Sequence, residues 1–334
     1  MGLPLTGRLM DNPRLKQLSI RLLQVFITVV RLGNVSAAAR QLHLTQPTVS
    51  LQLKKIAELV GEPLLESRDG VMRPTDVGEE VYRAACDILS RLDDLDDFLG
   101  GIKQGESGHI RIGLVTTAKY VMPRILGPFY RRFPKVQVTL SIGNRAHVLN
   151  RFAHQEDDLY LFSHPPAGES VLASRIITNP LKLIAPADHW AVGQKGLGFD
   201  VLKGERFIMR EPGSATRMMF ESWLSARGIE LTDIMQIESN EAIRLSVASG
   251  LGLSVISAHT LSEGDMGPEK PAVLDVADFP LRSNWYLVAR RDKRLPQSAL
   301  QLIRFMAEHL GDCIDPGYVA DNIEALHRVF TPSR

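Results

Sequence analysis

Residues 36–55 read SAAARQLHLTQPTVSLQLKK, and this stretch decides the fold of the first part of the chain. Three alanines precede a short break, and a second helical segment then starts with Thr-Gln-Pro-Thr. Thr45 is an N-cap candidate, and Pro47 suits the first turn of a helix, where its missing amide hydrogen costs nothing. The pattern predicts two short, closely packed helices. An amphipathic helix over 20–32, ended by Gly33, precedes them.

The second short helix is predicted to leave polar side chains on its outer face, because Val49, Leu53 and Ile56 form one apolar stripe. A helix that enters the major groove of DNA needs amide and hydroxyl groups in its first turn, since Gln pairs with adenine and Thr contacts thymine methyls or phosphates. Residues 61–74 add a predicted hairpin wing with basic side chains. The alternative is a plain helical hairpin with solvated Gln and Thr. The residues predicted to bind DNA are Ser36 (also the expected cap of the first short helix), Thr45, Gln46, Pro47, Thr48, Ser50, Gln52, Lys54, Lys55, Arg68 and Arg73.

Residues 36–79 resemble the winged helix-turn-helix of the LysR-type transcriptional regulators. The resemblance continues through TTAKY (116–120), QEDDL (155–159), REPGSATR (210–217), SNEAIRLSVASGLGLSVIS (239–257) and NWYLV (284–288), and is greatest to regulators of carbon-fixation operons. It implies double-stranded DNA as partner, a two-lobed effector domain of the periplasmic-binding-protein type, and dimers through a linker helix that often pair into tetramers. One departure is Leu51, where many relatives carry Arg.

Charge divides the chain unevenly. Residues 1–75 carry ten Lys or Arg against five Asp or Glu, whereas 76–99 carry eight acids against two arginines. Apolar residues within 76–99 recur at nearly heptad spacing, which favours a dimer stalk over a helix packed on its own domain. The run Asp93, Asp94, Asp96 and Asp97 fits a solvated face better than a metal site, because it lacks EF-hand spacing. The predicted dimer seam is Val77, Val81, Ala84, Ile88, Leu92, Leu95 and Leu99.

The body of the chain alternates strand and helix patterns, which indicates an α/β architecture with largely parallel sheets. Strands are expected over 109–115, 137–143 and 159–162, with helices over 118–133 and 298–310. The predicted domains are a winged helix-turn-helix over 14–75, a linker helix over 76–99, a flexible hinge over 100–108, a two-lobed effector domain over 109–310 with its second lobe at about 181–266, and a C-terminal tail over 311–334.

Several polar residues fall at predicted strand-to-helix junctions, where hydroxyls and free amides hold anions. Each one alone is more simply explained as an ordinary N-cap, and their recurrence at four junctions makes a ligand cleft as well supported as that alternative for the set. The residues predicted to bind an effector are Thr116, Thr117, Lys119, Asn144, Arg145, Glu211, Gly213, Ser214, Thr216, Arg217, Asn240 and Glu241.

An enzyme reading has no motif to support it, because the chain lacks HExxH, GxSxG, P-loop and CxxC patterns. Cys86 and Cys313 are far apart, so no metal or disulfide framework is expected. With no signal peptide and no apolar run of membrane-spanning length, we expect a cytoplasmic protein without a membrane partner.

Together these patterns predict a LysR-type DNA-binding regulator, not an enzyme, that uses no cofactor and responds to a small anionic metabolite. The resemblance narrows the effector to a sugar bisphosphate, phosphoenolpyruvate or an NADPH-like nucleotide, with carbon-fixation genes as targets. The alternatives are a LysR-type regulator of an unrelated metabolic operon and a small-molecule binding protein without DNA-binding regulation.

Overall fold

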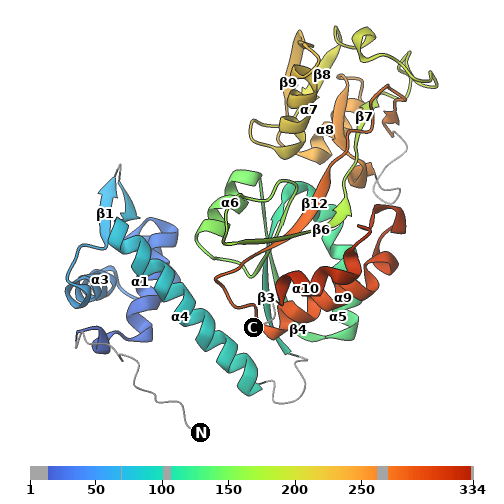
Figure 1. Ribbon diagram of the computed structural model, residues 1–334. Helices are drawn as coiled ribbons and strands as arrows, with labels where there is room; N and C mark the ends of the chain where they lie inside the picture. Colours follow the sequence, from blue (N-terminus) through green and yellow to red (C-terminus); the bar gives the residue numbers. More distant parts are fainter. Residues whose placement is uncertain (1–13, 69, 101–106, 262–269, 332–334) are drawn as a thin grey trace. The chain divides into compact units, whose positions relative to one another are not determined.

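The computed structural model describes residues 14–68, 70–100, 107–261 and 270–331, without the side chains at 90, 93, 94, 96–100 and 107. The chain forms two compact units, Met1–Leu99 and Gly100–Arg334 (Figure 1). The expected flexible hinge over 100–108 lies largely outside the described residues, as do the side chains of Asp93, Asp94, Asp96, Asp97 and Leu99.

The N-terminal unit is a helix-turn-helix followed by a hairpin and a long helix. Its elements are η1 (Leu15–Gln17), α1 (Ile20–Leu32), α2 (Val35–Gln41), α3 (Gln46–Val60), β1 (Leu65–Arg68), β2 (Val71–Pro74) and α4 (Asp76–Gly100). Val25 and Val29 of α1 pack in one apolar cluster with Ala38 and Ala39 of α2, whose small side chains allow the close approach. The helix predicted over 20–32 is confirmed.

Gly33 fixes the wing to the end of α1. It ends the helix in the left-handed conformation, with φ of 60°. Its carbonyl accepts a hydrogen bond of 2.8 Å from the amide of Met72 in β2. A Cβ at this position would come within 2.7 Å of Val71 Cγ1. Glycine is therefore favoured here both by backbone conformation and by the packing of the hairpin.

The larger unit has two lobes, and the first is formed from both ends of its sequence. The first lobe contains β3 (Ser107–Val115), η2 (Thr116–Tyr120), α5 (Met122–Arg132), β4 (Lys135–Gly143), α6 (Arg145–Ala153), β5 (Leu159–Phe162), β6 (Val171–Thr178), β12 (Asn284–Arg290), α9 (Gln297–Cys313), η6 (Pro316–Tyr318), η7 (Ile323–Ala325) and α10 (Leu326–Phe330). The single helix expected over 118–133 is wrong. The 3-10 helix η2 covers Thr116–Tyr120, and α5 begins only at Met122, with Pro123 in its first turn.

The sheet of the first lobe has the order β4-β3-β5-β12-β6. β3 pairs in parallel with β4 and β5, whereas β12 runs antiparallel to both β5 and β6. The expectation of largely parallel sheets is therefore wrong. A strand that returns to the first lobe from the second joins the sheet from the opposite direction, which local sequence patterns do not reveal.

The second lobe packs around a cluster of aromatic side chains that includes Phe199, Phe207, Phe220 and Trp223. It contains β7 (Leu181–Ala185), η3 (Phe199–Val201), β8 (Arg206–Met209), α7 (Ala215–Ser225), β9 (Asp233–Gln236), α8 (Asn240–Ala248), β10 (Ser254–Ser257), η4 (Ala258–Leu261) and β11 (Ala272–Val273). Its core extends beyond 266, as far as Leu281.

Two chain segments cross between the lobes and are hydrogen-bonded to each other. The amide of Asn179 donates to the carbonyl of Ser283 at 2.7 Å, and Leu181 and Leu281 exchange two backbone hydrogen bonds of 2.9 Å. This crossing ribbon, residues 178–181 with 281–284, continues the β6–β12 pairing into the second lobe (Figure 1).

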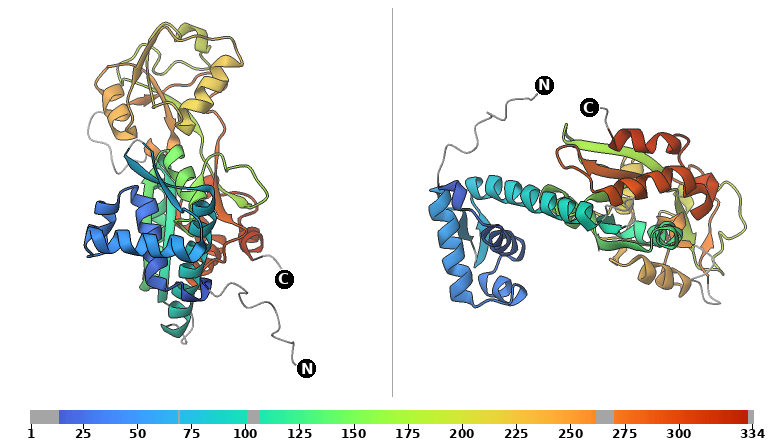
Figure 2. Two further views of the ribbon diagram at one scale, coloured as in Figure 1. Left: turned by 90° about the vertical axis from the view of Figure 1, so that its left-hand side faces the viewer. Right: turned by 90° about the horizontal axis from the view of Figure 1, so that it is seen from below.

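The end of the chain belongs to the first lobe. α9 runs past 310 to Cys313, and Leu326 and Phe330 of α10 are buried in the first-lobe core. The amide of Ala320 donates to the carbonyl of Ile176 on the edge strand β6. Figure 2 shows α10 beside α9. Residues 314–330 therefore cover a strand edge that would otherwise present unpaired backbone groups.

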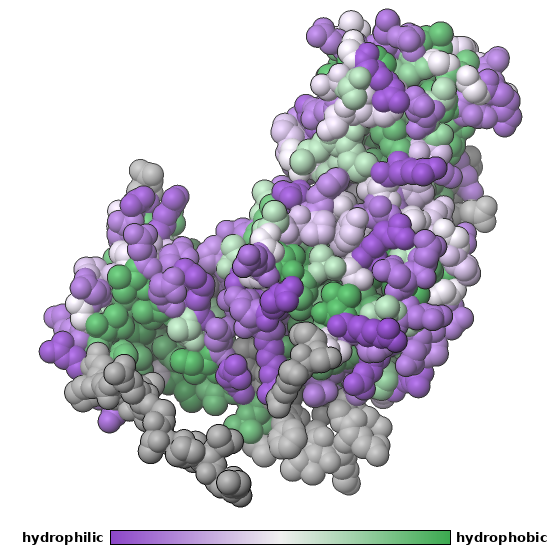
Figure 3. All heavy atoms as spheres, in the orientation of Figure 1, coloured by the Kyte–Doolittle hydropathy of each residue, from purple (hydrophilic) through white to green (hydrophobic). Residues whose placement is uncertain are grey.

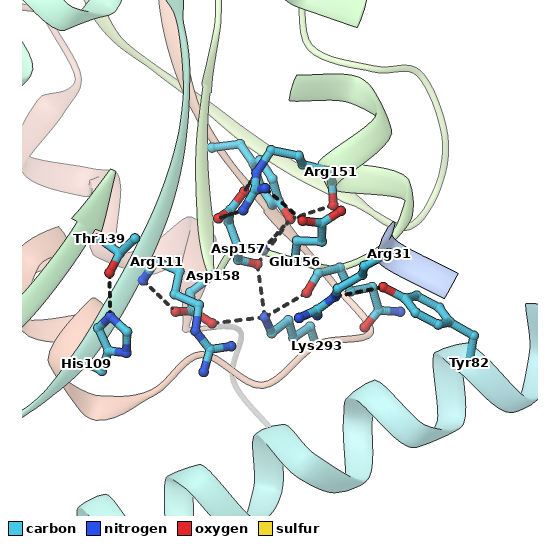
Figure 4. Close-up of polar contacts among 12 residues, drawn as sticks. Arg31, Tyr82, His109, Arg111, Thr139, Arg151, Glu156, Asp157, Asp158 and Lys293 are labelled. Atoms are coloured by element: carbon cyan, nitrogen blue, oxygen red, sulfur yellow. Dashed lines mark hydrogen bonds and ion pairs between the residues drawn. The ribbon is translucent and has the colours of Figure 1, made fainter. Parts of the chain in front are cut away.

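A buried ionic network holds the residues that directly precede β5 in the sequence (Figure 4). Lys293 lies 2.9 Å from Asp158 Oδ1 and donates to the carbonyl of Asp157, also at 2.9 Å. Arg151 holds the Asp157 carboxylate through two hydrogen bonds of 2.7 and 2.8 Å. Arg151 also forms an ion pair with Glu156 at 2.7 Å, so all three carboxylates in QEDDL have fixed cationic partners and the stretch has a structural function.

Removing Lys293 is expected to destabilise the larger unit. The side chains of Lys293 and Asp158 are 5% and 7% exposed, so Lys293→Ala leaves a buried carboxylate without its counter-ion. We expect a loss of about 3–5 kcal/mol in the free energy of unfolding, measured by denaturant titration. Lys195→Ala, which removes an exposed pair with Asp275, should change it by less than about 1 kcal/mol. Equal losses in the free energy of unfolding for the two substitutions would show that the buried Lys293 network stabilises the unit no more than an exposed ion pair does.

Candidate functional site

The first candidate surface is the exposed start of α3. Thr45 caps this helix, and its hydroxyl accepts from the amide of Thr48 at 3.3 Å, as predicted. Gln46 and Pro47 are exposed in the first turn, and Ser50 follows one turn later. The helix therefore presents amide and hydroxyl groups at its N-terminal end, the arrangement that reads base edges in a major groove.

Two residues near this surface differ from expectation. Ser36 does not cap α2, because Asn34 Oδ1 accepts from the amide of Ala37 at 2.9 Å and Ser36 lies half-buried inside the helix. Gln52 is half-buried, and its Oε1 is enclosed without a hydrogen-bond partner among the described residues. Leu51, in contrast, is 68% exposed on the same helix.

The predicted wing is present as the antiparallel pair β1–β2. Arg68 and Arg73 are both exposed on it, and Arg68 forms an ion pair with Glu66 at 2.7 Å. Lys54 and Lys55 are exposed on α3, with Lys54 in a long pair of 3.9 Å with Glu58. All four cations have solvent access, which contacts to DNA phosphates require.

α4 presents two different faces. Tyr82 and Ala85 are buried in the core of the N-terminal unit. The predicted seam lies mostly outside that core. Among its members, Val77, Ile88, Leu92 and Leu95 are 37–50% exposed, Ala84 is exposed and Val81 is half-buried. Figure 3 shows apolar surface gathered over this unit. The helix thus keeps an apolar row uncovered by its own unit.

The second candidate site is a recess between the two lobes of the larger unit, here called the interlobe recess. Its lining residues are Val115, Thr116, Thr117, Asn144, Arg145, Arg210, Glu211, Ser214, Ala215 and Thr216. Seven of them come from the twelve residues that the sequence predicts for effector binding. They lie at the C-terminal ends of β3, β4 and β8 and at the start of α7, where backbone amides point toward a ligand.

Several polar groups of the recess are left for a ligand. The hydroxyls of Thr117, Ser214 and Thr216 make no hydrogen bond within the described part of the chain, and Ser214 starts α7 without capping it. Arg145 is half-buried, and its Nε has no partner there either. Thr116 is different, because its hydroxyl donates to the carbonyl of Gly143 at 2.9 Å.

Arg210 is a site residue that the sequence analysis missed. It is 4% exposed, and its guanidinium forms two hydrogen bonds with the Glu211 carboxylate and a third, of 2.7 Å, with Asn240 Oδ1. Asn240 Nδ2 remains buried without a partner among the residues described. The adjacent Arg-Glu pair in REPGS was the available signal. The pair neutralises itself, so it provides shape and donors and no net charge.

Lys119 and Glu241 connect the lobes beside the recess. Lys119 Nζ in η2 lies 2.7 Å from Glu241 Oε1 in α8. Burial opposes the charged form of Glu241, but hydrogen bonds from Lys119, Tyr120 and Ser239 outweigh it and lower the pKa of Glu241 to about 2. Burial and the bond to Glu241 raise the pKa of Tyr120. The positive charge of Lys119 is therefore already offset by a partner.

The remaining predicted residues do not line the recess. Arg217 Nε donates to Glu221 at 2.6 Å, and Arg217 Nη1 donates to the carbonyl of Arg210 at 2.9 Å. The guanidinium group of Arg217 is therefore already hydrogen-bonded within the second lobe. Gly213 forms the preceding turn with φ of 85°. The sequence favours Arg217 as the anion-binding arginine, but Arg145 is the one of the two that lines the recess.

No cluster of His, Cys, Asp and Glu suited to a metal ion occurs among the described residues. The same residues contain no helix both long and apolar enough to cross a membrane.

Two family profiles match the chain. The profile described as bacterial regulatory helix-turn-helix protein, lysR family, matches residues 20–79, and that of the LysR substrate binding domain matches 103–311. The chain belongs to the LysR family of transcriptional regulators. This confirms the resemblance drawn from residues 36–79, the winged helix-turn-helix with a two-lobed effector domain, and the function as a LysR-type DNA-binding regulator.

The chain is similar to other transcriptional regulators along most of its length. It is 37% identical over 296 residues to the transcriptional activator CmpR of Synechocystis, covering 88% of this chain and 97% of CmpR. It is 37% identical over 281 residues to the RuBisCO operon transcriptional regulator of Acidithiobacillus ferrooxidans, covering 84% and 91%. The regulatory domain of Synechocystis CcmR in complex with 2-PG superposes with a TM-score of 0.56 at 34% identity, covering 60% of this chain and 97% of that domain.

The interlobe ion pair predicts a pH dependence. Since the folded-state pKa of Glu241 lies below its ordinary 4.5, the stabilisation from the pair is fully present above pH 4.5 and is lost as the pH falls toward 2. The melting temperature of the wild type should therefore exceed that of Glu241→Gln by a constant amount from pH 7 to 5, and by less at pH 3. Glu324→Gln, at an exposed carboxylate without an ion pair in the described chain, is the control. A difference that grows on acidification would contradict the assignment.

Proposed function

We propose that this LysR-type regulator controls carbon-fixation genes in response to a small phosphate-bearing anion bound in the interlobe recess. The observation that carries the proposal is the set of free donors in one place: three hydroxyls without partners and the unpaired Nε of Arg145, contributed by both lobes. The similarity to the RuBisCO operon transcriptional regulator of Acidithiobacillus ferrooxidans supports the choice of target genes.

The chemistry of the recess supports a compact anion. The cavity volume of the recess is about 20 Å³, far below the roughly 300–1,000 Å³ of pockets for drug-sized ligands, so this arrangement of the lobes excludes a large ligand. Of the charged groups around it, Glu211 offsets Arg210 and Glu241 offsets Lys119, which leaves Arg145 as the cation for a ligand. We infer a ligand of the size and charge of 2-phosphoglycolate, the 2-PG bound by CcmR. A nucleotide of NADPH size, one of the expectations from sequence, has no support here.

The proposed roles of the segments follow the division of the chain into two units. We infer that residues 14–75 read DNA through Gln46, Thr48 and Ser50, with Lys54, Lys55, Arg68 and Arg73 on phosphates. Residues 76–99 join two copies, 100–108 form the joint, and 109–310 with the C-terminal segment form the effector domain. As a DNA-binding regulator the protein works in the cytoplasm and is not an enzyme.

The exposed apolar row on α4 supports a dimer. Val77, Ile88, Leu92 and Leu95 recur on one helical face and are left uncovered by their own unit. A second copy of the same helix would bury this row, as in a two-stranded coiled coil. Pairing of two dimers into a tetramer would then place four recognition helices on paired half-sites of an operator.

The recognition helix is tested by separating base reading from phosphate binding. Gln46→Ala should lose about 1–3 kcal/mol of binding free energy on the operator and relax the preference at one base pair in each half-site. Lys55→Ala should weaken all DNA sequences alike and flatten the salt dependence. Gln17→Ala, at an exposed glutamine outside α3, is the matched control. Unchanged operator preference in Gln46→Ala, measured by fluorescence anisotropy, would exclude this helix as the reader.

The effector site is tested by calorimetry on the full chain with 2-phosphoglycolate. Arg145→Gln should weaken binding about 10-fold to 150-fold, because a charge-assisted hydrogen bond contributes about 1.5–3 kcal/mol. Thr117→Val should weaken it less. DNA affinity without effector should stay within about twofold of the wild type, since neither residue belongs to the N-terminal unit. Arg304→Gln, at an exposed arginine of α9, should bind normally. Wild-type affinity in Arg145→Gln would remove the interlobe recess from the mechanism.

A further inference from the structure

A second cavity lies where the C-terminal segment meets the crossing ribbon, here called the hinge cavity. Its cavity volume is about 410 Å³, larger than that of the interlobe recess. It is lined by Arg175, Thr178, Pro180, Arg282, Ser283, Asn284, Gly317 and Tyr318. Both strands of the ribbon and the 3-10 turn η6 therefore contribute to its wall.

The charges of the lining favour an anion. Two guanidinium groups, Arg175 and Arg282, line the cavity, and no lining residue is a carboxylate. Arg282 is exposed and forms no ion pair or hydrogen bond within the described ranges. Arg175 pairs with Asp321 at 3.1 Å, but that aspartate is 96% exposed, so water screens the pair strongly. A phosphate or carboxylate would find one free guanidinium and a second that is weakly held.

The rest of the wall suits an apolar or flat group. Tyr318 is half-buried, and its ring lies 4.6 Å from that of His259, which fixes its orientation. Its backbone carbonyl accepts from the Thr178 hydroxyl at 3.3 Å, which joins η6 to the ribbon. Pro180 adds a rigid apolar surface. Aromatic ligands pack on such surfaces, and guanidinium groups stack on their rings.

The hinge cavity shares part of its wall with the space between the lobes. Arg282, Ser283 and Asn284 also line a cavity bounded by Ser163, His164, Pro165, Met219 and Tyr286. That cavity adjoins the interlobe recess, because Arg145 Nη2 donates to the carbonyl of His164 at 3.4 Å. A ligand that holds Arg282 in the hinge cavity would therefore also change the wall of this second cavity, on the other side of the ribbon.

We propose that the hinge cavity is a second ligand site, which takes a small aromatic anion through Arg282, Arg175 and Tyr318 and couples it to the interlobe recess. The ligand contacts both crossing strands, so its affinity depends on the angle between the lobes. Two arrangements of the lobes that differ in this angle bind it unequally, and binding shifts the population toward one of them. The site itself does not depend on the proposed function, whereas the coupling does.

The test is calorimetry on the full-length protein with phenyl phosphate as the probe. We expect saturable binding that weakens at least about 10-fold in Arg282→Gln and in Tyr318→Leu. Arg328→Gln, at an exposed arginine of α10 without a described partner, is the matched control and should bind as the wild type does. Inorganic phosphate should bind more weakly than phenyl phosphate and should be insensitive to Tyr318→Leu, because it lacks the ring.

Three results would overturn the site: no binding of phenyl phosphate, unchanged affinity in Arg282→Gln, or a loss in Arg145→Gln as large as in Arg282→Gln, which would place the probe in the interlobe recess. Arg282 is exposed, so its variant should fold even if Tyr318→Leu does not. Coupling is tested by repeating the titration with 2-phosphoglycolate present. Each ligand should change the affinity for the other by the same factor, and independent binding would refute the coupling. Failure of 2-phosphoglycolate to bind would refute the proposed function alone.

Discussion

The regulatory half of this protein depends on the backbone pairing between its two crossing segments. Asn179 with Ser283, and Leu181 with Leu281, join residues about a hundred positions apart by hydrogen bonds of 2.7–2.9 Å. This pairing returns the chain to the first lobe as β12 and brings the end of β3 opposite the start of α7. Without it, Thr117 and Ser214 would belong to separate bodies, and the interlobe recess would not exist.

Charge neutralisation then decides which ligand the proposed site would select. Four charged groups near it are paired before any ligand arrives: Arg210 with Glu211, and Lys119 with Glu241. Fixed pairs of this kind provide oriented donors while adding little net field, so selectivity falls to Arg145 and to the hydroxyls. Because the Lys119–Glu241 pair spans the two lobes, it also contributes to holding them together, and a ligand that attracts Lys119 would compete with it. If the proposed site binds its ligand, the charge of that ligand would therefore affect the arrangement of the lobes.

Local sequence signals predicted local structure well. The bounds of α1 and β5, the Thr45 cap and the wing follow from periodicity, capping and turn chemistry, which act within a few residues. The position of Asn34 as the cap of α2 was missed because Asn and Ser are nearly equivalent at N-caps and stand two residues apart. Contacts between residues far apart in the sequence could not be predicted from these local signals. The antiparallel return of β12 and the C-terminal cover over β6 depend on pairings that no short window contains.

The same limit of local sequence signals applies to the interlobe recess. Junction residues such as Thr117, Asn144 and Ser214 were found because strand ends and helix starts converge at one edge of an α/β lobe. Choosing between Arg145 and Arg217 required knowing that Glu221 and a backbone carbonyl already hold Arg217. Arg210 was overlooked for the opposite reason, since its self-neutralised pair with Glu211 resembles surface charge in the sequence. A crystal structure of the full chain with 2-phosphoglycolate would show directly whether the interlobe recess binds this anion. We expect its phosphate within hydrogen-bond distance of Arg145 Nε and the Ser214 hydroxyl, between the lobes. A ligand bound elsewhere, with these groups left without a partner, would contradict this expectation.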